Sequence, residues 1–257
     1  MQVKDWFFTE AFVNFYGIAC LELRRPIQFL AMPAPACPPC PRECAYSNAD
    51  QEVAVSMDPR WTSRQAQQYA TRAIFHHLIT REGFPAVRIR KNFLGQDPAR
   101  KLCYRLNWRV LGLVVNQKID RFSAAEQQDL LLTELFVNTI KYINVCHEHA
   151  HDCIELSLPA LDIFYQYFSL RPRQQRQLAG TVKHKWPQVY RLLMQMIRLS
   201  EHYSVMQPAE CKDMLEAIIA LLGVEEVVEV YYRSDAGQAG QHEREIVTYE
   251  QLCRLAP

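Results

Sequence analysis

Residues 123–143 read SAAEQQDLLLTELFVNTIKYI, and this stretch carries the clearest helical signal of the chain. Ser123 and Glu126 form a capping-box pattern, in which both side chains satisfy backbone N–H groups at the start of a helix. Leucine, valine and isoleucine then recur at the spacing of one helix face. A long amphipathic helix is expected here, and helices of this kind are expected to build the fold.

Similar helical patterns lie on both sides of this stretch. Thr62 and Gln65 form a second capping box before another run of apolar residues. Asp97 followed by Pro98 is a typical helix start, although a hairpin remains an alternative for residues 98–118. Further helices are expected at residues 4–24, 159–169, 173–184, 187–205 and 208–222.

Strand signals are short and few. Residues 86–93 alternate between apolar and basic side chains, which predicts a short strand. Residues 227–232 and 246–247 are β-branched or aromatic and flank a glycine-containing turn, which predicts a hairpin with a short helix after it. The predicted fold is mainly α (α+β). It has a helical bundle-like core in a single domain over residues 1–257, an irregular Pro/Cys-rich segment at 31–60, and a short β-hairpin near the C-terminus within 224–257.

Composition excludes several classes of protein. The chain has 257 residues, 49% of them hydrophobic and 22% charged, which is typical of a folded globular protein. No apolar run approaches the roughly 20 residues of a membrane span, and no secretory signal pattern opens the chain. None of the eight glycines forms a phosphate-binding loop motif. Nine cysteines, an odd number, without an Asn-x-Ser/Thr acceptor predict free thiols or metal ligands in an intracellular protein, cytoplasmic or nuclear.

Charge is segregated along the chain although the net charge is only +1. Residues 60–121 hold 13 Lys or Arg against 3 Asp or Glu, and residues 171–198 hold 7 against none. Acidic residues elsewhere compensate for these two blocks. A basic block of this kind indicates contact with phosphates or with an acidic protein.

Lys101, Arg105 and Arg109 fall at i, i+4 and i+8 of the helix expected there, beside Tyr104 and Trp108. Such a row suits phosphates, and aromatic rings can stack on unpaired bases. The alternative is that the basic blocks are solvated faces or pair with acidic helices inside the molecule. The predicted surface for nucleic acid or an acidic protein partner comprises Arg88, Arg90, Lys91, Lys101, Arg105, Arg109, Arg173, Arg176, Lys183 and Lys185.

Three cysteines, Cys37, Cys40 and Cys44, lie within eight residues of a proline-rich segment. Thiolates at this spacing can wrap one tetrahedral zinc ion. A fourth ligand is then expected from Cys103, Cys146, His147, His149, His151 or Cys153. The alternative is that these cysteines are reduced thiols without a metal.

Residues 147–151 read HEHAH and satisfy the H-E-x-x-H pattern. The pattern resembles the zinc-binding motif of zincin metallopeptidases, which implies that His147 and His151 share a zinc ion and that Glu148 is the general base. No H-x-x-G-x-x-H continuation follows in this chain. The resemblance covers five residues and implies a zinc-dependent hydrolase as one candidate function.

Two other interpretations of the same stretch remain open. On a helix, Cys146, His149 and Cys153 fall at i, i+3 and i+7, which would suit a closed structural zinc site shared with the proline-rich cysteine segment. Alternatively, the histidines mark the C-terminal end of a helix, where its dipole favours them without any ion.

The leading functional prediction is a noncatalytic regulatory or assembly protein, with zinc as a candidate cofactor. It would engage nucleic acid or an acidic protein partner within a larger complex. The combination of segregated charge, a cysteine-rich irregular segment and no complete catalytic motif favours this prediction over an enzyme. The alternatives are a zinc-dependent hydrolase that uses Glu148, and a structural interaction subunit without metal.

Overall fold

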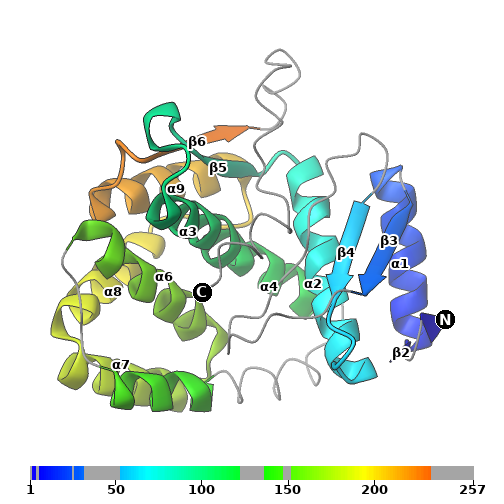
Figure 1. Ribbon diagram of the computed structural model, residues 1–257, viewed down its shortest axis with the longest axis horizontal. Helices are drawn as coiled ribbons and strands as arrows, with labels where there is room; N and C mark the ends of the chain where they lie inside the picture. Colours follow the sequence, from blue (N-terminus) through cyan, green and yellow to red (C-terminus); the bar gives the residue numbers. More distant parts are fainter. Residues whose placement is uncertain are drawn as a thin grey trace. The chain divides into compact units, whose positions relative to one another are not determined.

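The computed structural model describes residues 2–3, 6–24, 26–31, 53–121, 136–146 and 152–232. The chain divides into two compact units, one containing the described residues up to 82 and the other those from 83 onward (Figure 1). Each unit is mostly helical. The expectation of one single domain stays a prediction, and so does the short helix expected after residue 248, which lies outside the described residues.

The first unit combines two helices with short strands. Strands β1 (Gln2–Val3) and β2 (Trp6–Phe7) pair antiparallel, and β3 (Ile27–Ala31) and β4 (Val53–Met57) pair parallel. Helix α1 (Glu10–Leu23) packs on α2 (Ser63–Arg81), where the rings of Phe15 and Phe75 stack with centroids 4.9 Å apart. Aromatic burial therefore holds these two helices together.

The helix predicted over residues 4–24 is shorter than expected. It begins at Glu10 because the Thr9 side chain accepts a hydrogen bond from the backbone N–H of Phe12, while Trp6 and Phe7 form a strand. The irregular segment predicted at 31–60 lies mostly outside the described residues. Its described end contains a strand, β4, which the sequence did not reveal because its apolar run is only five residues long.

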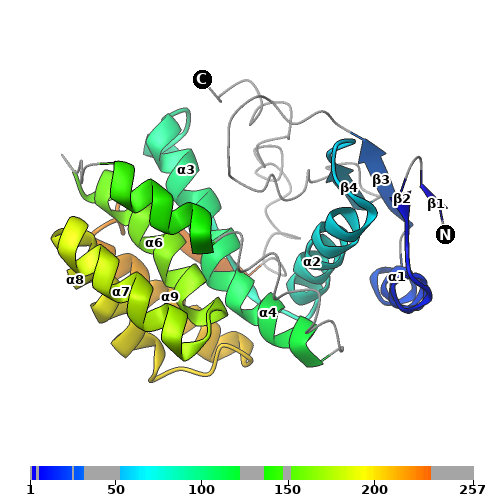
Figure 2. The ribbon, with the colours of Figure 1, turned by 90° about the horizontal axis from the view of Figure 1, so that it is seen from below.

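The second unit is a set of packed helices (Figure 2). Helix α6 (Cys153–Ser169) lies centrally and contacts α3 (Asp97–Arg105), α4 (Leu111–Arg121), α7 (Pro172–Lys185), α8 (Pro187–Ser200) and α9 (Pro208–Leu222). Residues 136–145 are also helical. Fully buried apolar side chains form its core, among them Leu102, Leu161, Phe164, Leu193 and Met196.

One sheet completes the second unit. Strand β5 (Pro85–Ile89) pairs antiparallel with β6 (Val228–Tyr232), so that Val87 lies opposite Val230. The mainly helical fold with a short antiparallel sheet near the C-terminus is thus confirmed. The sheet partner of β6 that the structure describes is the distant strand β5, and the hairpin partner expected at 246–247 lies outside the described residues.

Several local signals are confirmed by the backbone. Thr62 and Gln65 make both hydrogen bonds of a capping box at the start of α2. Gly223 ends α9 with φ of 66°, a left-handed conformation that costs glycine little. Within the described ranges, no helix combines the length and the apolar character that a membrane crossing requires.

Between Arg105 and Leu111 the helix widens into one π-helical turn, Leu106–Val110. The hairpin considered for residues 98–118 is therefore wrong, since α3, the π turn and α4 are continuous. Just after the turn, Gly112 lies against α6, where an added Cβ would come within 2.8 Å of the Tyr165 ring. The absence of a side chain at Gly112 allows α4 and α6 to approach closely at this point.

Candidate functional site

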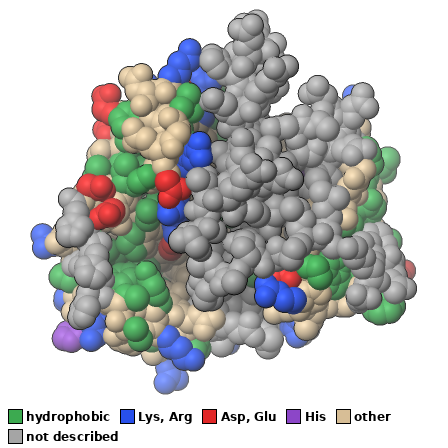
Figure 3. Space-filling view, in the orientation of Figure 1, with side chains coloured by type: hydrophobic (Ala, Val, Ile, Leu, Met, Phe, Trp, Pro, Cys, Tyr) green, Lys and Arg blue, Asp and Glu red, His purple; other side chains and the backbone are tan. Residues whose placement is uncertain are grey.

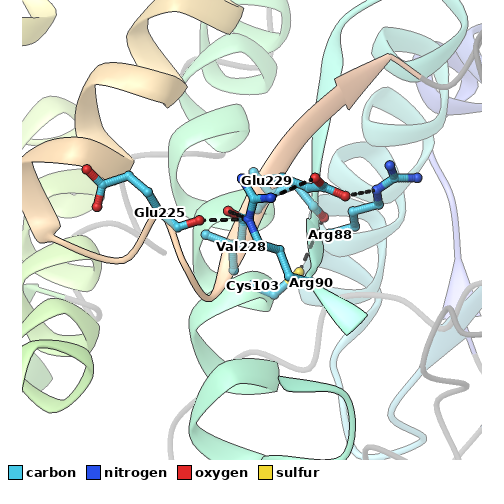
Figure 4. A network of polar contacts seen from close by, with 7 residues as sticks. Arg88, Arg90, Cys103, Glu225, Val228 and Glu229 are labelled. Atoms are coloured by element: carbon cyan, nitrogen blue, oxygen red, sulfur yellow. Dashed lines mark hydrogen bonds and ion pairs between the residues drawn. The ribbon is translucent and has the colours of Figure 1, made fainter. Parts of the chain in front are cut away.

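The outer face of the β5–β6 sheet carries a polar network (Figure 4). Arg88 Nε donates to Glu229 Oε1 at 2.6 Å, and Arg90 lies 3.4 Å from the other oxygen of the same carboxylate. Arg90 Nε also donates to the backbone carbonyl of Glu225 at 2.8 Å. Arg88 and Arg90, two of the six arginines of the predicted surface, are therefore engaged by groups of the chain itself.

Cys103 belongs to the interior side of this region, where Figure 4 shows its sulfur directed at β5. Its thiol donates to the carbonyl of Val87 at 3.3 Å. Burial raises the pKa of the Cys103 thiol to about 12, with a hydrogen bond from Asn107 opposing that shift. The protonated thiol is therefore favoured at neutral pH, and it is already engaged by a backbone carbonyl.

Arg105 and Arg109 do not form the open row expected from their spacing. Asp162 of α6 accepts a hydrogen bond from each, with Oδ2 2.8 Å from Arg105 Nε and Oδ1 2.8 Å from Arg109 Nε. The three side chains are only 20%, 14% and 26% exposed. Here the alternative interpretation of the sequence holds, because these two basic residues pair with an acidic residue of a packed helix.

The remaining members of the predicted row also differ from expectation. Lys101 pairs with Asp97 one turn earlier at 2.7 Å, in an exposed contact. Trp108 is 3% exposed, so its ring is part of the core and is not available for stacking on a base. Lys91, which belongs to the predicted surface but not to this row, is exposed in the short 3₁₀ helix Lys91–Phe93.

Helices α7 and α8 carry the second basic block, and here the cations are exposed. We define the α7–α8 basic face as the six exposed residues Arg173, Arg176, Lys183, Lys185, Arg191 and Arg198. Among the described residues, none of the six pairs with a carboxylate, and residues 163–200 contain no Asp or Glu. The structure thus divides the predicted surface: four arginines and Lys101 pair with carboxylates of the chain, whereas Lys91 and the four residues on α7 are exposed without such a pair among the described residues.

Three aromatic rings lie at the α7–α8 corner, those of buried Trp186, half-buried Tyr190 and exposed Tyr142. Trp186 joins the two helices and donates from Nε1 to the carbonyl of Cys146 at 3.2 Å. Its ring is nearly perpendicular to that of Tyr142, with the ring centroids 5.6 Å apart. Lys183 Nζ lies 5.9 Å from the centre of the Tyr190 ring. In Figure 3, separate groups of Lys and Arg side chains are visible at the lower left, beside hydrophobic side chains.

The predicted metal ligands are mostly beyond what the structure describes. Cys37, Cys40, Cys44, His147, His149 and His151 lie outside the described residues, as does Glu148. Among the described residues, no three His, Cys, Asp or Glu side chains lie close enough together to hold a metal ion. Zinc binding and the hydrolase alternative therefore stay predictions.

The helical arrangement proposed for Cys146, His149 and Cys153 is wrong at its described ends. Helical structure stops at residue 145, and Asp152, just before α6, is extended with φ of −142° and ψ of 173°. The side chain of Asp152 caps α6 by accepting from the N–H of Glu155 at 2.8 Å. Cys146 consequently follows the helix that ends at residue 145 and Cys153 begins α6, so the two do not lie on one face of a single helix.

Three features of the site were missed from the sequence. Asp162 gave no signal, because its two partners lie more than 50 residues away. Arg191 and Arg198 could have been included, since the acid-free stretch extends through α8.

Comparison with protein-family models, with curated proteins and with solved structures found no match.

Proposed function

We propose that the chain is a noncatalytic binding protein that contacts an anionic macromolecular partner, within a larger assembly, through the α7–α8 basic face. The observation that carries this proposal is a set of six exposed cations on two packed helices with no acidic residue on either helix. A polyanion carries condensed counterions, and a cationic surface that neutralises its charges releases them, which favours binding.

The contrast with the other basic block supports the choice of surface. Arg88, Arg90, Arg105 and Arg109 are each held by a carboxylate of the chain, within 3.4 Å or less. A cation paired in this way attracts an external anion less strongly, because the carboxylate already neutralises its charge. It would also have to break that internal contact to bind a partner. The exposed cations of α7 and α8 require no such rearrangement.

Charge reversal on α7 is expected to abolish binding to a polyanion. We expect the triple substitution Arg173→Glu, Arg176→Glu and Lys183→Glu to lower affinity for a heparin-like polyanion at least about 100-fold at 0.1 M salt, because attraction at three contacts becomes repulsion. The measurement is heparin-column retention together with titration calorimetry. Circular dichroism should stay unchanged, since all three side chains are exposed.

A control uses two exposed lysines outside this face and changes the net charge by four, against six in the triple variant. Lys91→Glu with Lys101→Glu should leave retention within about twofold of its original value. Neither lysine belongs to the α7–α8 basic face, and salt at 0.1 M screens the effect of charges that do not contact the polyanion. An equal loss of retention in this control and in the α7 variant would show that net charge, and not the α7–α8 basic face, determines binding.

Zinc is proposed as a structural cofactor of the cysteine-rich segment, on the sequence spacing of Cys37, Cys40 and Cys44. Protein purified without added metal is expected to contain about one zinc ion per chain by elemental analysis, and Cys37→Ser with Cys40→Ser should remove it. Cys20→Ser, a change in α1, is the control and should retain the metal. A metal-free wild-type protein would rule out this cofactor.

A further inference from the structure

We infer that the α7–α8 basic face binds the phosphate backbone of duplex nucleic acid, without reading its sequence. This inference rests on the proposed function and narrows the anionic partner to one class. The residues that surround the cations, and the spacing of the cations along the two helices, both point to this partner.

The composition of the face does not suit a protein partner. Apart from Pro172, Pro187 and Gly180, every exposed residue of the two helices is Arg, Lys, His or Gln. Stable protein interfaces place apolar or aromatic anchors in a desolvated centre, and none is exposed here. The same lack of exposed apolar side chains on α7 and α8 argues against insertion into an anionic membrane surface, which needs buried apolar contacts as well as charge.

Neither aromatic residue of α7, α8 or the turn between them is placed for stacking, and the 58% exposed ring of Tyr142 on the preceding helix packs at 87° to the ring of Trp186. Trp186 is 4% exposed and is fixed by its hydrogen bond to Cys146, while Tyr190 is half-buried beside Lys183. Proteins that hold single strands stack unpaired bases on exposed rings, whereas a duplex hides the faces of its bases and presents its phosphate backbone outermost. The face therefore fits a duplex better than a single strand.

The spacing of the cations fits a row of phosphates. Arg173 and Lys183 lie ten residues apart on one helix, which corresponds to about 15 Å, and Arg191 and Arg198 lie about 10 Å apart. Helices α7 and α8 pack on each other, and axes of packed helices are separated by roughly 8–10 Å, so the two rows lie on neighbouring helices. A duplex presents a phosphate charge every 1.7 Å or so of its axis, enough for about four direct contacts.

The test is fluorescence anisotropy of the full chain with labelled duplexes of 24 base pairs, one of DNA and one of RNA, each in two unrelated sequences. We expect both sequences of at least one duplex type to bind equally, with log affinity falling against log salt at a slope of about −4. The single strand of the same length should bind at least about tenfold more weakly, because no ring stacks on its bases.

Variants and competing probes make the outcomes distinct. Arg191→Gln with Arg198→Gln should reduce the salt slope by about two, whereas Lys91→Gln with Lys101→Gln should leave it unchanged. Binding to poly-glutamate or to anionic phosphatidylserine vesicles without binding to either duplex would overturn the duplex inference and leave the proposed function standing. Tighter binding to the single strand would also overturn it. Absence of binding to every polyanion would overturn both.

Discussion

Replacing Asp162 with alanine is expected to lower the free energy of unfolding by about 3 kcal/mol, since breaking a pair of largely buried ions leaves the remaining charge uncompensated. In this chain two guanidinium groups, those of Arg105 and Arg109, share the single carboxylate at 2.8 Å each. Removal would leave both cations next to each other and away from bulk water. Urea denaturation at pH 7, with the slope compared between variants, measures the effect.

The control for this prediction is Glu216→Ala on α9. Glu216 accepts from Lys212 at 2.6 Å, but the glutamate side chain is 48% exposed and the pair lies one turn apart on a single helix. Exposed pairs of this kind contribute about 0.5 kcal/mol or less. Equal losses for the two substitutions would mean that Asp162 adds no more than a surface ion pair, and that the helices are held by apolar packing alone.

A second substitution separates charge from shape at the same position. Asp162→Asn keeps one acceptor oxygen but directs an N–H₂ group at the other guanidinium, so it should recover only part of the lost stability. Complete recovery would show that hydrogen bonding without charge is sufficient. Polyanion binding by the α7–α8 basic face should be equal in the wild type, Asp162→Ala and Asp162→Asn. In the part of the chain described by the structure, none of the cations of this face contacts Asp162.

Local sequence signals predicted the helices well because they act within a few residues. The capping box of Thr62 and Gln65 starts α2, and Gly223 ends α9, each through hydrogen bonds or backbone freedom that neighbours alone determine. Where local propensity competes with tertiary context, the prediction failed. Trp6 and Phe7 continue the apolar pattern of α1 and yet form a strand, because Trp6 packs away from solvent and donates to the carbonyl of Trp61.

The basic residues show the same division between local and distant information. The spacing of Lys101, Arg105 and Arg109 correctly indicated a helix, but their partners are set by packing. Lys101 finds Asp97 within one turn, while the two arginines meet Asp162 on a helix whose position periodicity does not encode. A block without any acidic residue, such as 163–200, offers its cations no carboxylate nearby in sequence, and the cations of the α7–α8 basic face are exposed.

Asn107, in the π-helical turn, is expected to be the most sensitive polar residue of the sheet region. Its side-chain oxygen accepts from the N–H of Val87 at 2.9 Å, and its N–H₂ group donates to the carbonyl of Val87 at 2.8 Å. The amide thus pairs with the edge of β5 that faces away from β6, in the way that a neighbouring strand would. Asn107→Ala should cost about 2–4 kcal/mol by urea denaturation, because two backbone groups of the buried residue Val87 lose this partner.

Asn107→Asp gives this prediction a pH-dependent signature. The new carboxylate can still accept from the N–H of Val87, but its second oxygen faces the Val87 carbonyl, so the charged form is disfavoured in the folded state. Its pKa should therefore be raised on folding, and the destabilisation relative to wild type should be present at pH 7 and shrink as the pH falls towards about 4, where a protonated carboxyl can donate. Asn92→Asp, an exposed change in the 3₁₀ helix, should show no such recovery. A pH-independent loss for Asn107→Asp would mean that the amide does not act as a strand mimic, because donor and acceptor would then be interchangeable at this edge.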